Sequence, residues 1–285
     1  MRPSFPLVIV LASLSLFGCA TVKVGMGTIS PFQSIADKGD VLVTIDTTKE
    51  KDLAQALLGS EELSKRSTRL SVAFKPMDAT YPLDTGKCSM LALAEGDYPS
   101  VLVNTALLYD SSYAHIDDSY YQKGETKLGS LSSNIVLLTT GEYYASKKKV
   151  RTGPVTIDEL TSMQMAFHSM ALYCEDPITM FDLGLGIPQS VVSQAKSILI
   201  FLDATSDGRH VLSARIVMDS PQLADSLNKL VRSAYVANLR RDKIQFSLVE
   251  LKKMFTIDKD MFTITEMNIS ALQFSQLIGG VSATV

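Results

Sequence analysis

Among the residues of this 285-residue chain that could do chemistry, Cys19 has the most informative surroundings. Arg2 gives the chain a positive start, residues 7–17 form an uncharged apolar run, and the small Gly18 precedes the cysteine. This order of features is typical of a secretory signal that is cleaved at its end. Cys19 lies directly at the end of this predicted signal.

The four residues Leu16-Phe17-Gly18-Cys19 resemble the lipobox of bacterial lipoproteins, although Phe17 replaces the small residue usual at that position. The alternatives are an ordinary signal peptide and a core helix that happens to hold a cysteine. The apolar run is shorter than the roughly 20 residues needed to span a bilayer. Anchoring would instead come from acyl chains, at about 0.8 kcal/mol per buried methylene. The resemblance implies a signal peptide over 1–18, a lipidated cysteine, and residence in the bacterial cell envelope.

Residues suited to catalysis or metal binding are dispersed along the chain. The three histidines are far apart in the sequence, at His115, His168 and His210. A zinc site needs ligands clustered at short spacing, and the familiar glycine-loop, nucleophile-elbow and paired-histidine motifs are absent. Asp117 and Asp118 with Glu125 are interpreted as a solvated acidic loop rather than a cation site. We expect no enzyme activity, no metal and no cofactor, and keep an unrecognised hydrolase as the less favoured alternative.

The remaining cysteines, Cys88 and Cys174, each lie at the end of an apolar run. An exported compartment permits a disulfide between them. Because both runs are expected in the core, two buried free thiols are the favoured prediction.

Charge is mild and slightly negative, with 27 Lys and Arg against 30 Asp and Glu and a formal net charge of −3. This balance argues against nucleic acid as a partner. Basic residues cluster at 147–151 and at 240–243. Each charge could contribute about 1 kcal/mol against anionic headgroups, but solvated charge at the ends of elements is the favoured interpretation.

A tether with Gly, Ser and Pro is predicted over 19–39 and a folded body over 40–285. Apolar or alternating runs predict strands at 40–46, 69–75, 88–94, 135–138, 197–203, 211–218 and 262–267. Capping signatures and helical periodicity predict helices after Thr47, over 101–109 and 156–174, and after Ser220, Ser247 and Ser270. Residues 110–134 lack a clear period and are expected to form loops or a hairpin.

This mixture of elements, with short connections and no apparent sequence repeat, predicts an α+β fold. We expect a mixed, mostly antiparallel sheet packed against amphipathic helices. The body is expected to be one unit, or two subdomains that meet near 147–155.

Two of the predicted helices are unusually apolar, those over 156–174 and 271–278. In the first, one stripe contains Leu160, Met163, Phe167, Met170, Ala171 and Cys174, and the opposite side contains Met165 and Leu172. The second has no charged residue and contains Leu272, Phe274, Leu277 and Ile278. A helix that is apolar on two sides needs two partners. Either both are parts of the protein core, or one is lipid or an apolar cavity. We take the Leu, Met, Phe and Ile side chains of these two helices as candidate lipid contacts.

The chain also resembles the lipoproteins of spirochaetes. The resemblance rests on the cysteine-ended signal, the short tether, the strand and turn Ala92-Leu-Ala-Glu-Gly-Asp-Tyr-Pro99, and the strand–hairpin–helix over 198–241. The layout is most similar to treponemal outer-membrane-associated lipoproteins whose amphipathic helices insert into the bilayer. The resemblance implies residence on the periplasmic face of the outer membrane, and Ala20 after Cys19 is compatible with outer-membrane sorting.

The sequence therefore predicts a non-enzymatic, membrane-anchored lipoprotein that binds or inserts into lipid through apolar helices and alters membrane permeability. Its expected partner is membrane lipid, and no protein partner is identified. The alternative is a periplasmic carrier or scaffold that holds an apolar ligand or a protein partner between sheet and helices.

Overall fold

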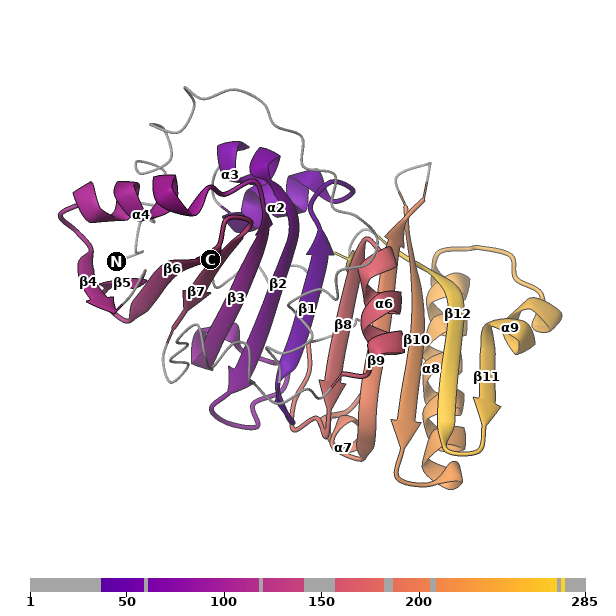
Figure 1. Cartoon of the computed structure of the whole chain (residues 1–285). Helices are drawn as coiled ribbons and strands as arrows, with labels where there is room; N and C mark the ends of the chain where they lie inside the picture. Colours follow the sequence, from indigo (N-terminus) through magenta and orange to yellow (C-terminus); the bar gives the residue numbers. More distant parts are fainter. Residues whose placement is uncertain are drawn as a thin grey trace.

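The structure is a computed structural model that describes residues 37–58, 61–117, 120–140, 157–181, 187–205, 209–270 and 273–274. Within these ranges, one 12-stranded sheet has the order β11-β12-β10-β9-β8-β1-β2-β3-β7-β6-β5-β4 (Figure 1). Every neighbouring pair is antiparallel. The predicted α+β fold with a mostly antiparallel sheet is thus confirmed. Cys19, the basic cluster 147–151 and the boundary near 147–155 lie outside the described residues.

The described strands are β1 (Val41–Asp46), β2 (Ser67–Pro76), β3 (Cys88–Gly96), β4 (Ala114–Asp117), β5 (Tyr120–Lys123), β6 (Thr126–Ser132), β7 (Ile135–Thr139), β8 (Met170–Glu175), β9 (Ala195–Ala204), β10 (His210–Met218), β11 (Phe255–Asp258) and β12 (Met261–Ile269). The described helices are α2 (Lys51–Leu58), α3 (Glu61–Arg66), α4 (Ser100–Tyr109), α6 (Glu159–Phe167), α7 (Gln189–Val192), α8 (Pro221–Arg241) and α9 (Leu248–Met254), with a 3₁₀ turn, η3 (Thr85–Lys87).

The middle strands of the sheet are apolar on both faces because both faces are covered there. In β1, the side chains of Val41, Val43 and Ile45 join a large core cluster, which defines the back face of the sheet. Leu42, between them, joins a second cluster on the opposite side, the front face. Strand alternation therefore divides one continuous apolar run between two cores.

The helices are distributed unequally over these two faces. The 21-residue α8 packs on the back face and buries Ala224, Leu227, Val231 and Tyr235, which share one side of the helix. Its predicted cap is confirmed, since the Ser220 side chain accepts a hydrogen bond from the Leu223 amide. On the front face α6 lies in front of β8 and β9, roughly along these strands (Figure 1).

The connectivity repeats although the sequence shows no repeat. Strands β1, β2 and β3 form a meander, α4 follows, and β7 returns beside β3. Strands β8, β9 and β10 form a second meander, α8 follows, and β12 returns beside β10. The two first strands, β1 and β8, pair with each other at the centre of the sheet. One sheet thus runs through both halves of the chain.

Two local predictions are corrected by the structure. The helix expected over 156–174 ends at Phe167, and its second half is strand β8. A strand buried on both faces and an apolar helix have similar apolar sequences. Here the segment is a strand because it pairs with β1 and β9. The region 110–134 contains three strands, β4, β5 and β6, which form a meander where loops or a hairpin were expected.

Both described cysteines are free thiols, as predicted. Cys174 is buried in β8, whereas Cys88, at the start of β3, is only partly buried. Burial raises the pKa of both thiols, that of Cys88 to about 11. Both side chains are therefore neutral at physiological pH, which makes them poor nucleophiles.

Leu172→Ala is expected to lower the free energy of unfolding by about 2–5 kcal/mol, because Leu172 is fully buried in the back-face cluster. Urea-induced unfolding measures this change. Met163→Ala is the matched control on the outward side of α6, and it should shift the stability by less than about 0.5 kcal/mol. Equal stability of the two variants would contradict the core position of Leu172.

Candidate functional site

Helix α6 is short, and an isolated nine-residue helix is only marginally stable in water. Its apolar attachment to the sheet is small: Met165 is fully buried in the front-face cluster, together with Ile157 just before the helix. At its start, Asp158 is the N-cap and accepts hydrogen bonds from the Thr161 amide at 2.9 Å and the Thr161 hydroxyl at 2.6 Å. These hydrogen bonds lower the pKa of Asp158 below its usual value, so the cap stays ionised.

The end of α6 is held by two basic side chains, one from β2 and one from the turn after β1. Arg69 Nη2 donates to the carbonyl of Ala166 at 2.7 Å, and Lys49 Nζ donates to that of Phe167 at 2.7 Å. Both charges lie where the helix dipole favours cations. Burial lowers the pKa of Arg69, and the nearby carboxylates of Glu95 and Asp46 oppose that shift.

The turn from α6 into β8 is fixed by a histidine and an aspartate. His168 Nδ1 lies 2.5 Å from Asp203 Oδ2, and Asp203 Oδ1 accepts a hydrogen bond from the Ser169 amide at 2.9 Å. The His168 ring also stacks on Phe201, with ring centroids 4.1 Å apart. Sequence reasoning missed this pair, because Asp203 is 35 residues away and comes from β9.

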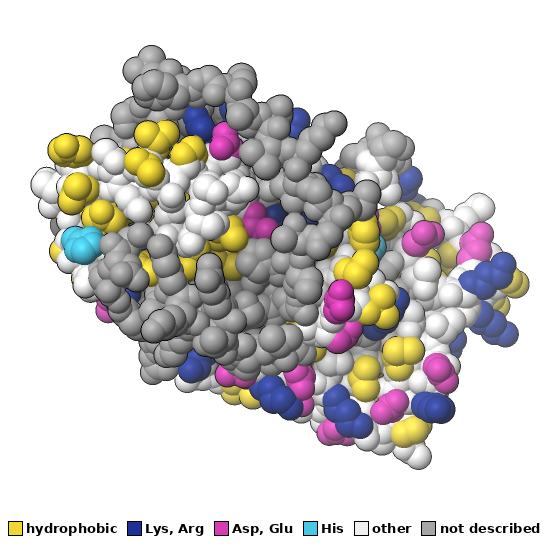
Figure 2. Space-filling model, in the orientation of Figure 1, with side chains coloured by type: hydrophobic (Ala, Val, Ile, Leu, Met, Phe, Trp, Pro, Cys, Tyr) yellow, Lys and Arg dark blue, Asp and Glu magenta, His cyan; other side chains and the backbone are white. Residues whose placement is uncertain are grey.

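The outward side of α6 is an exposed apolar stripe of three side chains. Leu160, Met163 and Phe167 keep 65%, 51% and 62% of their surface exposed. Figure 2 shows hydrophobic side chains gathered over this helix. Their positions, i, i+3 and i+7, place them on one face of a helix. Because both ends of α6 are fixed, the stripe is presented by a firmly held element.

The predicted lipid contacts of this region are therefore divided by the structure. Leu160, Met163 and Phe167 lie at the surface, where a lipid contact requires them. Met165, on the side opposite that stripe, is fully buried. Met170 and Leu172 are core residues of β8, which corrects their assignment as lipid contacts. The predicted grouping of Met170, Ala171 and Cys174 with this stripe was wrong, because these residues belong to β8 and not to the helix.

The second predicted contact region, 271–278, is described only at Gln273 and Phe274. The predicted capping box is confirmed: Gln273 Oε1 accepts from the Ser270 amide, and Ser270 Oγ accepts from the Gln273 amide. Phe274 stacks on the ring of His210, with centroids 3.5 Å apart, and packs against the core. Phe274 therefore faces the protein in this structure. Leu272, Leu277 and Ile278 lie outside the described residues.

Helix α4 is an apolar surface that sequence reasoning did not select as a lipid contact. Its ten residues include no charge. Val103 and Leu107 are buried in a cluster with β5 and β6, whereas Val101, Leu108 and Tyr109 are exposed. The lack of any charged residue in this helix is the sequence feature that could have indicated an apolar surface.

The other two histidines contact side chains of neighbouring elements of the fold. His210 Nε2 lies 3.4 Å from Glu50 Oε1, and both side chains are largely buried. His115 meets the ring of Tyr121 edge-on. Within the described residues, no group of three or more His, Cys, Asp and Glu side chains could hold a metal.

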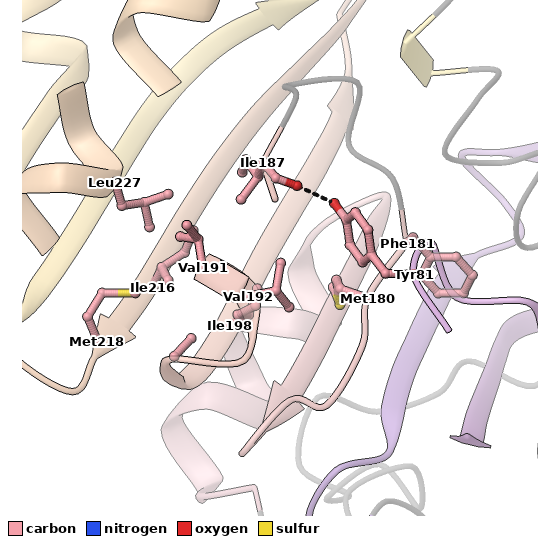
Figure 3. Close-up of a pocket in the computed structure, with 11 residues that line it drawn as sticks. Tyr81, Met180, Phe181, Ile187, Val191, Val192, Ile198, Ile216, Met218 and Leu227 are labelled. Atoms are coloured by element: carbon pink, nitrogen blue, oxygen red, sulfur yellow. Dashed lines mark hydrogen bonds between the residues drawn. The ribbon is translucent and has the colours of Figure 1, made fainter. Parts of the chain in front are cut away.

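A cavity and a groove in the structure are relevant to the alternative function, a carrier that holds an apolar ligand. Between α7, α8 and the back face, a cavity of about 20 Å³ is lined by side chains that include Met180, Phe181 and Leu227 (Figure 3). Tyr81 closes one side of it by donating a hydrogen bond to the Ile187 carbonyl at 2.8 Å. Ligand pockets usually measure about 300–1,000 Å³, so this cavity has no room for an apolar ligand. A groove of about 320 Å³ between α8, α9 and β12 is larger, but it is partly lined by carboxylates and amides.

No helix in the described part of the chain is both long enough and apolar enough to cross a bilayer.

Comparison with known proteins shows a shared fold. No protein family and no curated protein matches the sequence. The fold is similar to crystal form I of TP0453 from Treponema pallidum, with a TM-score of 0.61 and 13% identity over 90% of this chain and 99% of that one. Crystal forms III and IV of the same protein have TM-scores of 0.55 at 11% and 12% identity, again over 90% of this chain and over 99% and 97% of theirs. The structural similarity to a treponemal protein agrees with the resemblance found in the sequence. The lipidation of Cys19 and the location of this protein in the cell stay predictions.

Arg69→Met is expected to loosen α6, because it leaves the Ala166 carbonyl without its charged donor. A hydrogen bond from a charged group contributes about 1.5–3 kcal/mol, so amide hydrogen exchange in α6 should accelerate at least about tenfold. Lys51→Met, at an exposed position of α2, is the control and should leave exchange in α6 unchanged. Unaltered exchange in Arg69→Met would contradict the role of Arg69 in holding the end of the helix.

Proposed function

We propose that this protein is a non-enzymatic lipoprotein of the bacterial cell envelope, anchored through acylated Cys19, whose body binds membrane lipid through the outward stripe of α6. Its place would be the periplasmic face of the outer membrane. Insertion of apolar side chains there would alter the permeability of the bilayer. The proposal includes membrane lipid as the partner and excludes nucleic acid.

The observation that carries this proposal is the exposure of Leu160, Met163 and Phe167 on a helix fixed at both ends. Fully burying one such side chain contributes about 1.5–3 kcal/mol. Since half or more of each is still exposed, moving the three into the acyl boundary would supply roughly 3–5 kcal/mol. That free energy corresponds to a dissociation constant of around a millimolar.

A lipid anchor makes such a weak contact effective. A flexible tether of about 20 residues has a root-mean-square length of about 25 Å. A short flexible linker gives effective concentrations in the millimolar range, which is close to the dissociation constant of the stripe. The anchored body would therefore alternate between lipid-bound and free orientations.

The proposal that the protein is not an enzyme is supported by the roles of its histidines. His168 holds the end of α6 through Asp203, and His210 packs between Glu50 and Phe274. Each of the two is thus engaged in structure.

Replacing the stripe tests the lipid contact. The chain lacking residues 1–19 retains every described residue, and its partition onto phosphatidylcholine vesicles can be measured by co-sedimentation. Leu160→Gln/Met163→Gln/Phe167→Gln should weaken this partition by about 100-fold, the equivalent of roughly 3 kcal/mol. The fold should be retained, because these side chains are exposed. Met77→Gln/Ile178→Gln changes two exposed apolar residues elsewhere and is the matched control. Equal binding by the triple variant and its parent would refute the α6 contact.

Cys19→Ser tests the anchor separately. The variant should lose acyl labelling in cells and move to the soluble fraction, because a millimolar contact alone does not retain a protein on the membrane. Unchanged labelling would rule out Cys19 as the acylation site.

A further inference from the structure

The corner formed by the end of α8, the following turn and α9, residues 240–253, combines exposed basic and aliphatic side chains. It contains five Lys or Arg and two acids, a net charge of +3 in a chain whose net charge is −3. The basic residues are Arg240, Arg241, Lys243, Lys252 and Lys253, and all five are exposed. Ile244, Leu248 and Val249 keep 53%, 71% and 63% of their surface exposed.

Within the described part of the chain, the lysines of this corner form no ion pair with its two acids. Asp242 and Glu250 line the groove between α8, α9 and β12, whereas none of the five basic residues does. Asp242 pairs with its neighbour Arg241, whose Nε lies 3.1 Å from Asp242 Oδ1. Figure 2 shows Lys and Arg side chains over α9, on the same face of the molecule as the hydrophobic side chains over α6. A positive surface is therefore present at the α9 edge of the sheet, separated from the outward stripe of α6 by strands β10 and β12.

The backbone of this corner holds one lysine in a conformation that is unfavourable for a residue other than glycine. The Ile244 amide donates to the Leu239 carbonyl and the Lys243 amide to the Arg240 carbonyl, which is the Schellman pattern. The left-handed position of that pattern usually holds glycine, but here it is occupied by Lys243, with φ of 57°. The apolar residue after it usually packs back on the helix, yet Ile244 is exposed.

Helix α9 has the same division between an anchored and an outward side. Leu251 is buried in the back-face core and holds the helix in place. Leu248 and Val249 lie one turn before Lys252 and Lys253, so that aliphatic and basic side chains share the outward side. The helix dipole accounts for lysines in the last turn, but it does not account for the exposed aliphatic residues.

We propose that this α8–α9 corner is a second, independent membrane contact that is selective for anionic phospholipid. Aliphatic side chains beside long basic ones are the composition of interfacial membrane segments, in which the first enter the acyl boundary and the second reach the phosphates. Attraction to anionic headgroups gives the corner a lipid preference that the uncharged stripe of α6 lacks.

The test compares phosphatidylcholine vesicles with vesicles of equal parts phosphatidylcholine and phosphatidylglycerol, using the chain lacking residues 1–19. Lys243→Gln/Lys252→Gln/Lys253→Gln should weaken partition onto the anionic vesicles by roughly 100-fold, about fivefold per charge, and leave partition onto neutral vesicles unchanged. High salt should remove the preference of the parent protein for anionic vesicles, because it shortens the screening length.

Lys51→Gln/Lys87→Gln/Lys229→Gln is the control, since it changes the net charge equally at three exposed lysines elsewhere. The proposal is overturned if this control loses as much anionic binding as the corner variant, or if the parent protein does not prefer anionic vesicles. The α6 variant separates the two contacts: it should weaken binding to both kinds of vesicle and leave the anionic preference intact.

Discussion

The position of β8 between β1 and β9 is the constraint on which the rest of the structure depends. Its register pairs Ile45 with Met170 and Ala171 with Phe201, and it joins the two halves of the sheet. A shift by one residue would exchange the faces of every side chain in the strand. Because β8 has a paired strand on each side, the chain directly before it cannot be a neighbouring strand, and α6 lies over the front face instead.

The attachment of α6 explains how an apolar outward side is compatible with a stable fold. Most small surface helices are held by their apolar face, but α6 contributes a single fully buried apolar side chain, Met165, to the front-face cluster. Its ends are instead fixed by Asp158, Arg69 and Lys49. These polar contacts stabilise the helix without using Leu160 or Phe167, which stay available to a partner outside the protein.

The two proposed membrane contacts differ in their physics and would act together. The stripe of α6 depends on apolar transfer, which is insensitive to moderate salt and to headgroup charge. The α8–α9 corner depends on charge attraction, which reaches only about a screening length from the surface. When the body is tethered by an acyl anchor, either contact raises the effective concentration of the other. Orientation on the membrane would then depend on lipid composition.

Much of the architecture was encoded locally and could be predicted from the sequence. The alternation of the strand runs, the Ser220 cap with Pro221, and the Ser270–Gln273 capping box all depend on residues close together in the chain. These features indicated the α+β class and the hairpin of β9 and β10. The candidate lipidation site is also a local pattern, since it consists of the apolar run and the cysteine that ends it.

Tertiary structure alone decided which apolar side chains face out. Residues 156–174 have a periodicity that fits a helix throughout, and only the pairing of β8 with two distant strands converts the second half into a strand. The same pairing buries Met165 and leaves Leu160, Met163 and Phe167 exposed. The charges that hold α6, from Arg69 and Lys49, are about a hundred residues away in sequence. Local sequence specifies that a segment is amphipathic, but the direction in which it faces is set by long-range packing, which has no local signature.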